Sequence, residues 1–211
     1  MSYSRQPLTD LLDRFASGPP VAGGGSAAGI SAALGTSLVI MAATLATAKA
    51  TPDAGGDLTA ASARLRGTQA RLLALADEDT VAYAAVLAAR RLPNDTTAHK
   101  ERRATMVQEA MRTATAVPLE MLRRCDEVLA EAVAIAALVP ADAAIDLAIG
   151  IELVAASLRG CGLCVEVNAR LLASDDVRRP IMEARTSILA SGTAHLERAF
   201  AARRPRMPSV P

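Results

Sequence analysis

Apolar residues recur at intervals of three and four along most of the chain, and no segment alternates apolar and polar residues as a half-buried strand would. Clusters of glycine and proline interrupt this pattern and mark the expected helix ends. The pattern predicts helices over residues 7–17, 26–49, 57–91, 97–116, 118–138, 141–172 and from about 175 to 202. Pro118 leaves an alternative open, because it either kinks one long helix or starts a new one. Six or seven helices joined by short connections are typical of an all-α bundle.

The length and composition suit a single domain. The chain has 211 residues, of which 51% are hydrophobic, so it can bury a sizeable core and is not expected to be disordered. We expect residues 1–204 to form one helical domain and the Pro-rich residues 205–211 to form a loose tail.

The segment from Val21 to Ala48 carries no charge and is long enough to cross a bilayer. However, Ala, Gly, Ser and Thr predominate in it, it starts from a glycine run, and it lacks an aromatic belt. We therefore interpret it as the central helix of a soluble bundle, in which small side chains allow close packing, and expect no membrane partner.

Charge and aromatic content exclude one class of partner. The formal net charge is +1 and aromatic residues make up only 2%, with no Trp, so neither a basic footprint nor a stacking platform for nucleic acid is present.

The first fifteen residues carry charges where a signal peptide has its apolar segment, which favours the cytoplasm. Cys161 and Cys164 have the spacing of a redox motif or half a zinc site, but thiols three residues apart on a helix are more often small core residues.

A glycine run at Gly23, Gly24 and Gly25 precedes Ser26 and the long apolar segment. No strand precedes it and no Gly-Lys-Ser/Thr ending follows, so a P-loop or a dinucleotide-binding turn is excluded. The glycines lead into a helix N-terminus, where free N–H groups and the helix dipole favour an anion. The alternative is a flexible turn between two helices.

Two acidic residues stand where acids are unusual. Asp79 continues the apolar stripe of the predicted helix 57–91, so it is either partnered or has a raised pKa, as an acid/base group would. The alternative is a solvated charge run with Asp77.

On the predicted helix 141–172, Asp146, Cys164 and Asn168 share a face of mostly small or polar residues, which indicates a groove. Lys49 ends the apolar helix, either as a structural cation or as a site residue.

Several motifs occur in an order that resembles a known family: the triple glycine with Ser26, the helix end at Lys49, Asp77-x-Asp79, Leu92-Pro93, Asp146-Leu147 and Asn168. The chain resembles the cyclodeaminase domain of formiminotransferase-cyclodeaminase and the free-standing methenyltetrahydrofolate cyclohydrolases. The resemblance implies an all-helical homodimer with a folate site that uses no metal or other cofactor. The substrate is then a tetrahydrofolate derivative, whose five-membered ring between N5 and N10 is closed with loss of ammonia or opened by water.

The resemblance implies roles for the site residues. Asp146 would be the main acid/base group or the stabiliser of the cationic centre, and Asp79 would orient the substrate or assist proton transfer. Lys49 would neutralise a carboxylate or developing negative charge. Backbone N–H groups of Gly23, Gly24, Gly25 and Ser26 would hold the ligand, beside Asn168 and Cys164.

The sequence departs from the family pattern at positions where polar groups are expected: Ala22, Ala48, Asn94, Val139, Pro140, Ile145 and Cys164. Three hypotheses therefore stand: a folate cyclohydrolase or cyclodeaminase, a relative that cyclises or hydrolyses C–N bonds of a non-folate substrate, and a helical dimer without catalysis.

Overall fold

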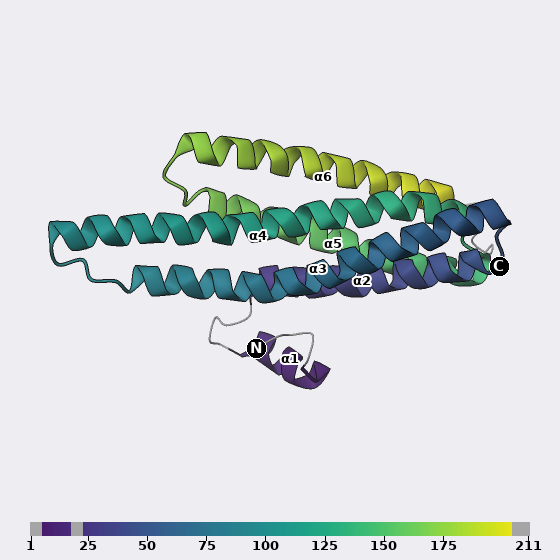
Figure 1. Cartoon of the computed structure of the whole chain (residues 1–211), viewed down its shortest axis with the longest axis horizontal. Coiled ribbons are helices and arrows are strands. Elements are labelled where there is room, and N and C mark those ends of the chain that lie inside the picture. Colours follow the sequence, from purple (N-terminus) through teal and green to yellow (C-terminus); the bar gives the residue numbers. More distant parts are fainter. Residues whose placement is uncertain (1–5, 18–22, 204–211) are drawn as a thin grey trace.

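The computed structural model describes residues 6–17 and 23–203, and within these ranges the chain is almost entirely helical (Figure 1). The helices are α1 (Leu8–Ala16), α2 (Gly24–Thr47), α3 (Pro52–Arg90), α4 (Thr97–Leu138), α5 (Ala144–Ala169) and α6 (Asp175–Arg203), with one 3-10 turn, η2 (Ala141–Ala143), before α5. The predicted all-α class is confirmed. The glycine and proline cluster at residues 18–20, which marks the predicted end of the first helix, lies outside the described residues, as do the departure at Ala22 and the tail 205–211.

Helix boundaries differ from the prediction at glycine and proline. Helix α2 begins at Gly24 rather than at Ser26, with Gly23 as its N-cap. Helix α3 begins at Pro52 rather than at residue 57, because proline suits the first helical position, whose N–H has no intrahelical partner. Pro118 lies inside one continuous α4, so it does not start a new helix.

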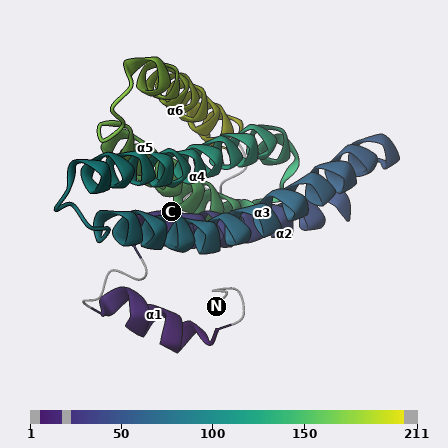
Figure 2. The same cartoon turned by 60° about the vertical axis from the view of Figure 1, so that its left-hand side comes forward.

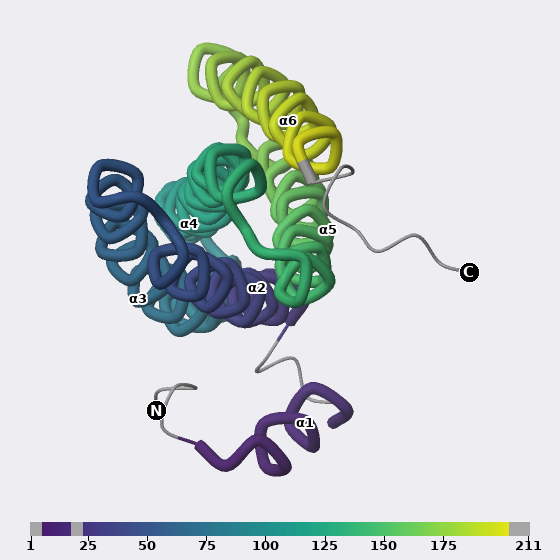
Figure 3. The backbone as a smooth tube through the Cα atoms, turned by 90° about the vertical axis from the view of Figure 1, so that its right-hand side faces the viewer, coloured from purple at the N-terminus to yellow at the C-terminus, as the bar shows by residue number. Residues whose placement is uncertain are grey.

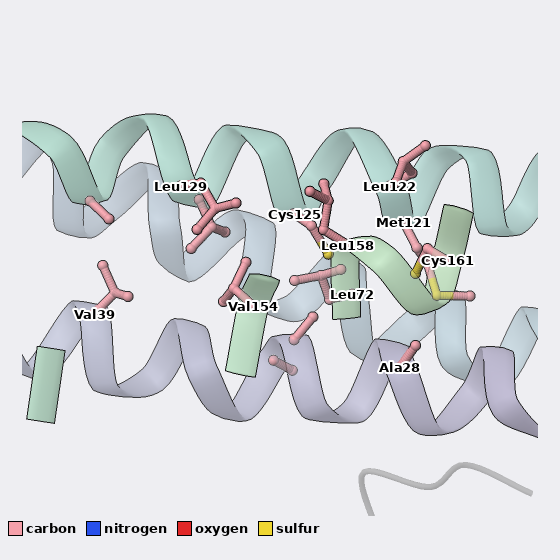
Figure 4. Packing of buried hydrophobic residues seen from close by; sticks show 14 of the residues in the cluster. Ala28, Val39, Leu72, Met121, Leu122, Cys125, Leu129, Val154, Leu158 and Cys161 are labelled. Atoms are coloured by element: carbon pink, nitrogen blue, oxygen red, sulfur yellow. The ribbon is translucent and has the colours of Figure 1, made fainter. Parts of the chain in front are cut away.

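Helices α2, α3, α4 and α5 pack around a shared core, and α6 lies against α4 and α5 (Figures 2 and 3). The core is aliphatic, and residues such as Leu72, Leu122, Leu129 and Val154 meet in it from three of these helices (Figure 4). Short α1 makes a separate small contact, in which Leu11 packs against Ala76 of α3.

The small residues of α2 allow the close packing that its composition predicts. A Cβ atom added to Gly35 would lie 2.7 Å from the carbonyl oxygen of Gly150, and one added to Gly150 would lie 2.8 Å from that of Gly35. Helices α2 and α5 therefore touch backbone to backbone, and Gly150 belongs to a packed seam rather than to a groove.

Two helices, α2 and the stretch from η2 through α5, are long and apolar enough to cross a membrane, but about half of each apolar window, 56% and 50%, is buried in the bundle. The remainder is partly buried or exposed. We call its large apolar residues the outer face: Leu34, Met41 and Leu45 of α2, and Ile145, Ile149, Leu163 and Val167 of α5. Burial in the bundle fits a core helix of a soluble protein, whereas the outer face still needs a cover.

Candidate functional site

A cavity of about 530 Å³ opens where the N-terminus of α2 meets the second half of α3, the middle of α4 and the C-terminal half of α5. Its walls combine one acid, one cation and one aromatic ring with bare backbone and aliphatic side chains. It is lined by Gly23, Gly24, Gly25, Asp79, Thr80, Tyr83, Val86, Arg90, Met111, Ala114, Leu163, Cys164, Val167, Asn168 and Leu171.

The carboxylate of Asp79 lies directly over the glycine run. A Cβ atom added to Gly25 would lie 2.5 Å from Oδ1 and 2.6 Å from Oδ2 of Asp79, so no side chain fits at position 25 while the carboxylate keeps its place. The Ser26 hydroxyl donates a hydrogen bond of 3.0 Å to Oδ2 of Asp79, and the Thr80 hydroxyl lies 3.1 Å from Ser26 Oγ. Glycine is therefore required at position 25 for close approach, and Ser26 fixes the carboxylate.

Burial raises the pKa of the Asp79 carboxyl above its ordinary value of 3.8, and the hydrogen bonds from the Ser26 hydroxyl and backbone N–H partly oppose this shift. The solvated charge run considered from the sequence therefore does not describe Asp79, which is only partly exposed. A carboxylate held in this way in the wall of a cavity is a candidate acid/base group.

The first turn of α2 already binds an anion of the same chain, the carboxylate of Asp79. Ser26 is fully buried and does not line the cavity, and its N–H and hydroxyl are directed to Asp79. The cavity is instead lined by the backbone of Gly23, Gly24 and Gly25. The N–H groups of the first helical turn have no partner within the helix, so those of the glycines are suited to a polar ligand.

Asn168 is positioned by the proline inside α4. Proline has no N–H, so Pro118 cannot donate to the carbonyl oxygen four residues earlier, at Ala114. The Asn168 Nδ2 atom donates to that oxygen at 2.7 Å. This contact fixes the side-chain amide of Asn168 in the wall of the cavity.

The thiols divide between the cavity and the core. Burial raises the pKa of the Cys164 thiol to about 11, and the neighbouring Cys161 and Asp79 add to the shift, so Cys164 lines the cavity as a neutral thiol and not as a nucleophile. Cys161 is completely buried next to Cys125 (Figure 4). The pair with redox spacing therefore consists of one core residue and one cavity residue.

Lys49 and Asp146 lie at the opposite end of the bundle. Lys49 Nζ pairs with Asp142 Oδ2 at 3.3 Å, and both side chains are exposed, by 60% and 74%. Asp146 follows Asp142 by one helical turn. Lys49 is 25 residues from Gly24 and Asp146 is 22 residues from Asn168, which correspond to about 37 and 33 Å along straight helices. A single chain therefore brings together Gly23, Gly24, Gly25, Asp79, Cys164 and Asn168, but neither Lys49 nor Asp146.

The positions that depart from the family pattern divide in the same way. Among the described ones, Cys164 lines the cavity. Ala48 ends α2, and Val139, Pro140 and Ile145 surround the start of α5, so these four are near Lys49 and Asp146. Asn94 lies in the turn between α3 and α4.

Two cavity residues, Tyr83 and Arg90, were not identified from the sequence. They follow Asp79 on the same stripe of α3, four and eleven residues later, so extending the stripe to the end of the helix would have found them. Within residues 6–17 and 23–203, no cluster of three or more His, Cys, Asp or Glu side chains could hold a metal ion. The expected absence of a cofactor stays a prediction.

Comparisons with known proteins agree with this architecture. A family model described as formiminotransferase-cyclodeaminase matches residues 7–187. The chain belongs to the formiminotransferase-cyclodeaminase family. A methenyltetrahydrofolate cyclohydrolase of Methylorubrum extorquens is 33% identical over 196 residues, which cover 92% of this chain and 94% of that protein. The resemblance predicted from the motifs is therefore confirmed.

Larger family members match over a shorter stretch. The formimidoyltransferase-cyclodeaminase of the pig, Sus scrofa, is 34% identical over 124 residues, or 57% of this chain and 22% of that protein. The crystal structure of a formiminotetrahydrofolate cyclodeaminase from Thermotoga maritima superimposes with a TM-score of 0.86 over 96% of this chain and 98% of that one, at 20% sequence identity. This family member thus shares its fold with a free-standing cyclodeaminase.

The close contact between Gly25 and Asp79 predicts that a side chain at position 25 will lower activity. Gly25→Ala places a methyl group where the carboxylate lies, and we expect kcat/KM for the reaction proposed below to fall about 10²-fold because the acid is displaced by about an ångström. Gly67→Ala is the control. Gly67 is exposed in α3 and its added Cβ would meet nothing within 4 Å, so this change should stabilise the protein by about 1 kcal/mol and leave kcat/KM unchanged. Equal activity in the two variants would show that the Asp79 position is not critical.

Proposed function

We propose that this chain is a methenyltetrahydrofolate cyclohydrolase, which opens the ring of 5,10-methenyltetrahydrofolate with water. The observation that carries the proposal is the Asp79 carboxylate, held against Gly25 by Ser26 in the wall of a cavity. The name of the relative that matches over nearly its whole length supports the same substrate.

The reaction needs a base close to a cationic carbon. In the substrate, one carbon joins N5 and N10 and shares a positive charge with them. Water adds to this carbon and Asp79 accepts one of its protons. Asp79 then returns this proton to N5 as the C–N5 bond breaks, and the added hydroxyl releases its own proton to solvent as it becomes the carbonyl of a formyl group on N10. A buried carboxylate both attracts the cation and accepts the proton, and the glycine N–H groups bind polar atoms of the ring system.

We also propose that two copies of the chain pack through the outer face. The large apolar side chains of this face remain exposed in the single chain, including Leu163 and Val167 at 62% and 59%, and these two also line the cavity. The open side of the cavity is therefore continuous with the apolar surface that needs a cover.

The charges of α5 suit an antiparallel pairing of two copies of this helix. Glu152 and Arg159 are exposed on the same side as the outer face, and a two-fold axis between residues 155 and 156 places each opposite the other residue of the second copy. The same axis places Ile149 near Leu163. It also places Asp146 of the second copy opposite residue 165, beside Cys164 and Asn168. Such a dimer would bring Asp146 into the cavity, with Lys49 near it.

The test is direct. Purified protein is mixed with 5,10-methenyltetrahydrofolate, and loss of the absorbance of the ring is compared with the uncatalysed rate at the same pH. Acceleration, with 10-formyltetrahydrofolate as product, supports the proposal. No acceleration excludes the cyclohydrolase, and a parallel assay for ammonia release from 5-formiminotetrahydrofolate then tests the cyclodeaminase reaction. Inactivity in both assays would leave the non-folate enzyme or the non-catalytic dimer.

The raised pKa of Asp79 predicts the acidic limb of the pH profile. The base must be ionised, so kcat/KM should fall as the pH drops through the Asp79 pKa, at a pH above 3.8 because burial raises this pKa. The Ser26 hydroxyl donates to the ionised form and lowers the pKa. Ser26→Ala should therefore move the limb to higher pH, whereas Ser37→Ala, which changes a serine outside the cavity wall, should not move it. A limb that stays in place in Ser26→Ala would assign it to another group.

A further inference from the structure

Five residues of α3 line the cavity, and four of them form a single stripe: Asp79, Tyr83, Val86 and Arg90, at spacings of four, three and four. Asp79 and Arg90 are eleven residues apart, which corresponds to about 16 Å along the helix. The cavity therefore has an acid at one end and a cation at the other, with an aromatic ring and an aliphatic side chain between them.

Arg90 is the cation among the described residues that line the cavity, and Asp79 is the acid. Arg90 is exposed, and only some of the other arginines of this bundle are paired. Arg71 bonds to Glu78 and Glu120, and Arg64 bonds to Glu131 at 2.6 Å. No ion pair found in residues 6–17 and 23–203 includes Arg90, and the acid of its own cavity lies three helical turns away. A guanidinium placed in this way is suited to bind a carboxylate with two parallel hydrogen bonds.

We infer that Arg90 binds the glutamate tail of the folate substrate and so determines preference for it. The inference rests on the proposed function. Along a reduced folate, the ring that reacts is followed by a p-aminobenzoyl ring and then by the glutamate carboxylates. Along α3, Asp79 is followed by Tyr83, whose ring suits stacking on an aromatic group, and then by Arg90. The order of chemical groups in the substrate matches the order of side chains on the helix.

Binding of two ligands that differ only in the tail tests the inference without turnover. The ligands are 5-formyltetrahydrofolate and 5-formyltetrahydropteroate, which lacks the glutamate, and the Kd of each is measured by calorimetry on wild type and on Arg90→Gln. In the wild type the tail should strengthen binding about 10-fold to 100-fold, as expected for hydrogen bonds to a charged group. In Arg90→Gln the two ligands should bind within about 3-fold of each other, because the interaction between residue and tail is lost.

The adjacent Arg91 provides the matched control. It is exposed at the C-cap of α3 and does not line the cavity. Arg91→Gln removes the same charge, so it should keep the wild-type preference for the tail. An equal preference in wild type and Arg90→Gln would overturn the inference and leave the cyclohydrolase intact. If the wild type binds neither ligand, the folate function itself fails, and the inference fails with it.

Discussion

Replacement of Asp79 by asparagine is expected to lower kcat/KM for hydrolysis of methenyltetrahydrofolate about 10² to 10⁴-fold, the range found when a general base is removed. Asparagine has nearly the same shape and still accepts a hydrogen bond from Ser26, but it cannot take a proton from water or attract the cationic substrate carbon. The measurement is the initial rate at several substrate concentrations, and the loss should fall mainly on kcat.

The fold should survive this change. Burial disfavours the charged form of Asp79, so the folded protein binds the proton more tightly than the unfolded chain does. The stabilisation that this group contributes is therefore lost as the pH rises from 3.8 through the raised pKa of the folded state. At neutral pH, a neutral asparagine avoids the cost of burying a charged carboxylate. Glu78→Gln is the matched control. It removes an exposed carboxylate one residue away that pairs with Arg71 outside the cavity wall. Comparable losses in Glu78→Gln and Asp79→Asn would contradict the role of Asp79.

Mixed dimers should regain activity that each parent lacks. If Asp146 acts in the cavity of the other copy, Asp79→Asn and Asp146→Asn homodimers are both inactive, because each site lacks one acid. Half of the dimers in a random mixture contain one chain of each kind, and one of their two sites has both acids. We therefore expect roughly a quarter of wild-type activity after co-refolding of equal amounts.

The control for this mixture uses two changes on the same side of the site. Asp79 and Asn168 line the cavity of one chain, so every site in an Asp79→Asn and Asn168→Ala mixed dimer carries one of the two changes. That mixture should recover nothing. An Asp79→Asn and Asp146→Asn mixture that stays inactive, or an Asp146→Asn homodimer with wild-type activity, would refute the shared site.

The helices could be predicted from the sequence because each has an apolar stripe and because Gly and Pro mark their ends. The errors are local: Pro52 starts α3 ahead of the predicted residue, since proline fits the first helical turn. The continuity of α4 through Pro118 depends on a tertiary contact, because the carbonyl that proline leaves free is satisfied by Asn168 from another helix.

The site could be predicted only in part. Motifs identified the glycine run, Asp79 and Asn168, which the structure brings together. The contact between Gly25 and Asp79 joins residues 54 positions apart and has no signal in the local pattern. Motif order also says nothing about distance, so it grouped Asp146 and Lys49 with residues that lie at the far ends of α5 and α2. Arg90 lies at the very end of α3, eleven residues after Asp79, so only the stripe extended to the helix end points to it.

A crystal structure with 5-formyltetrahydrofolate, a stable reduced folate, would show the site and the dimer together. We expect the pteridine ring to lie between the glycine run and Asn168, with its one-carbon group within hydrogen-bond reach of Asp79. We also expect the glutamate carboxylate to lie at Arg90 and a second copy to cover the outer face. A folate bound away from Asp79 would contradict the proposed catalytic site. A cavity with no second copy at its open side would contradict the proposed dimer.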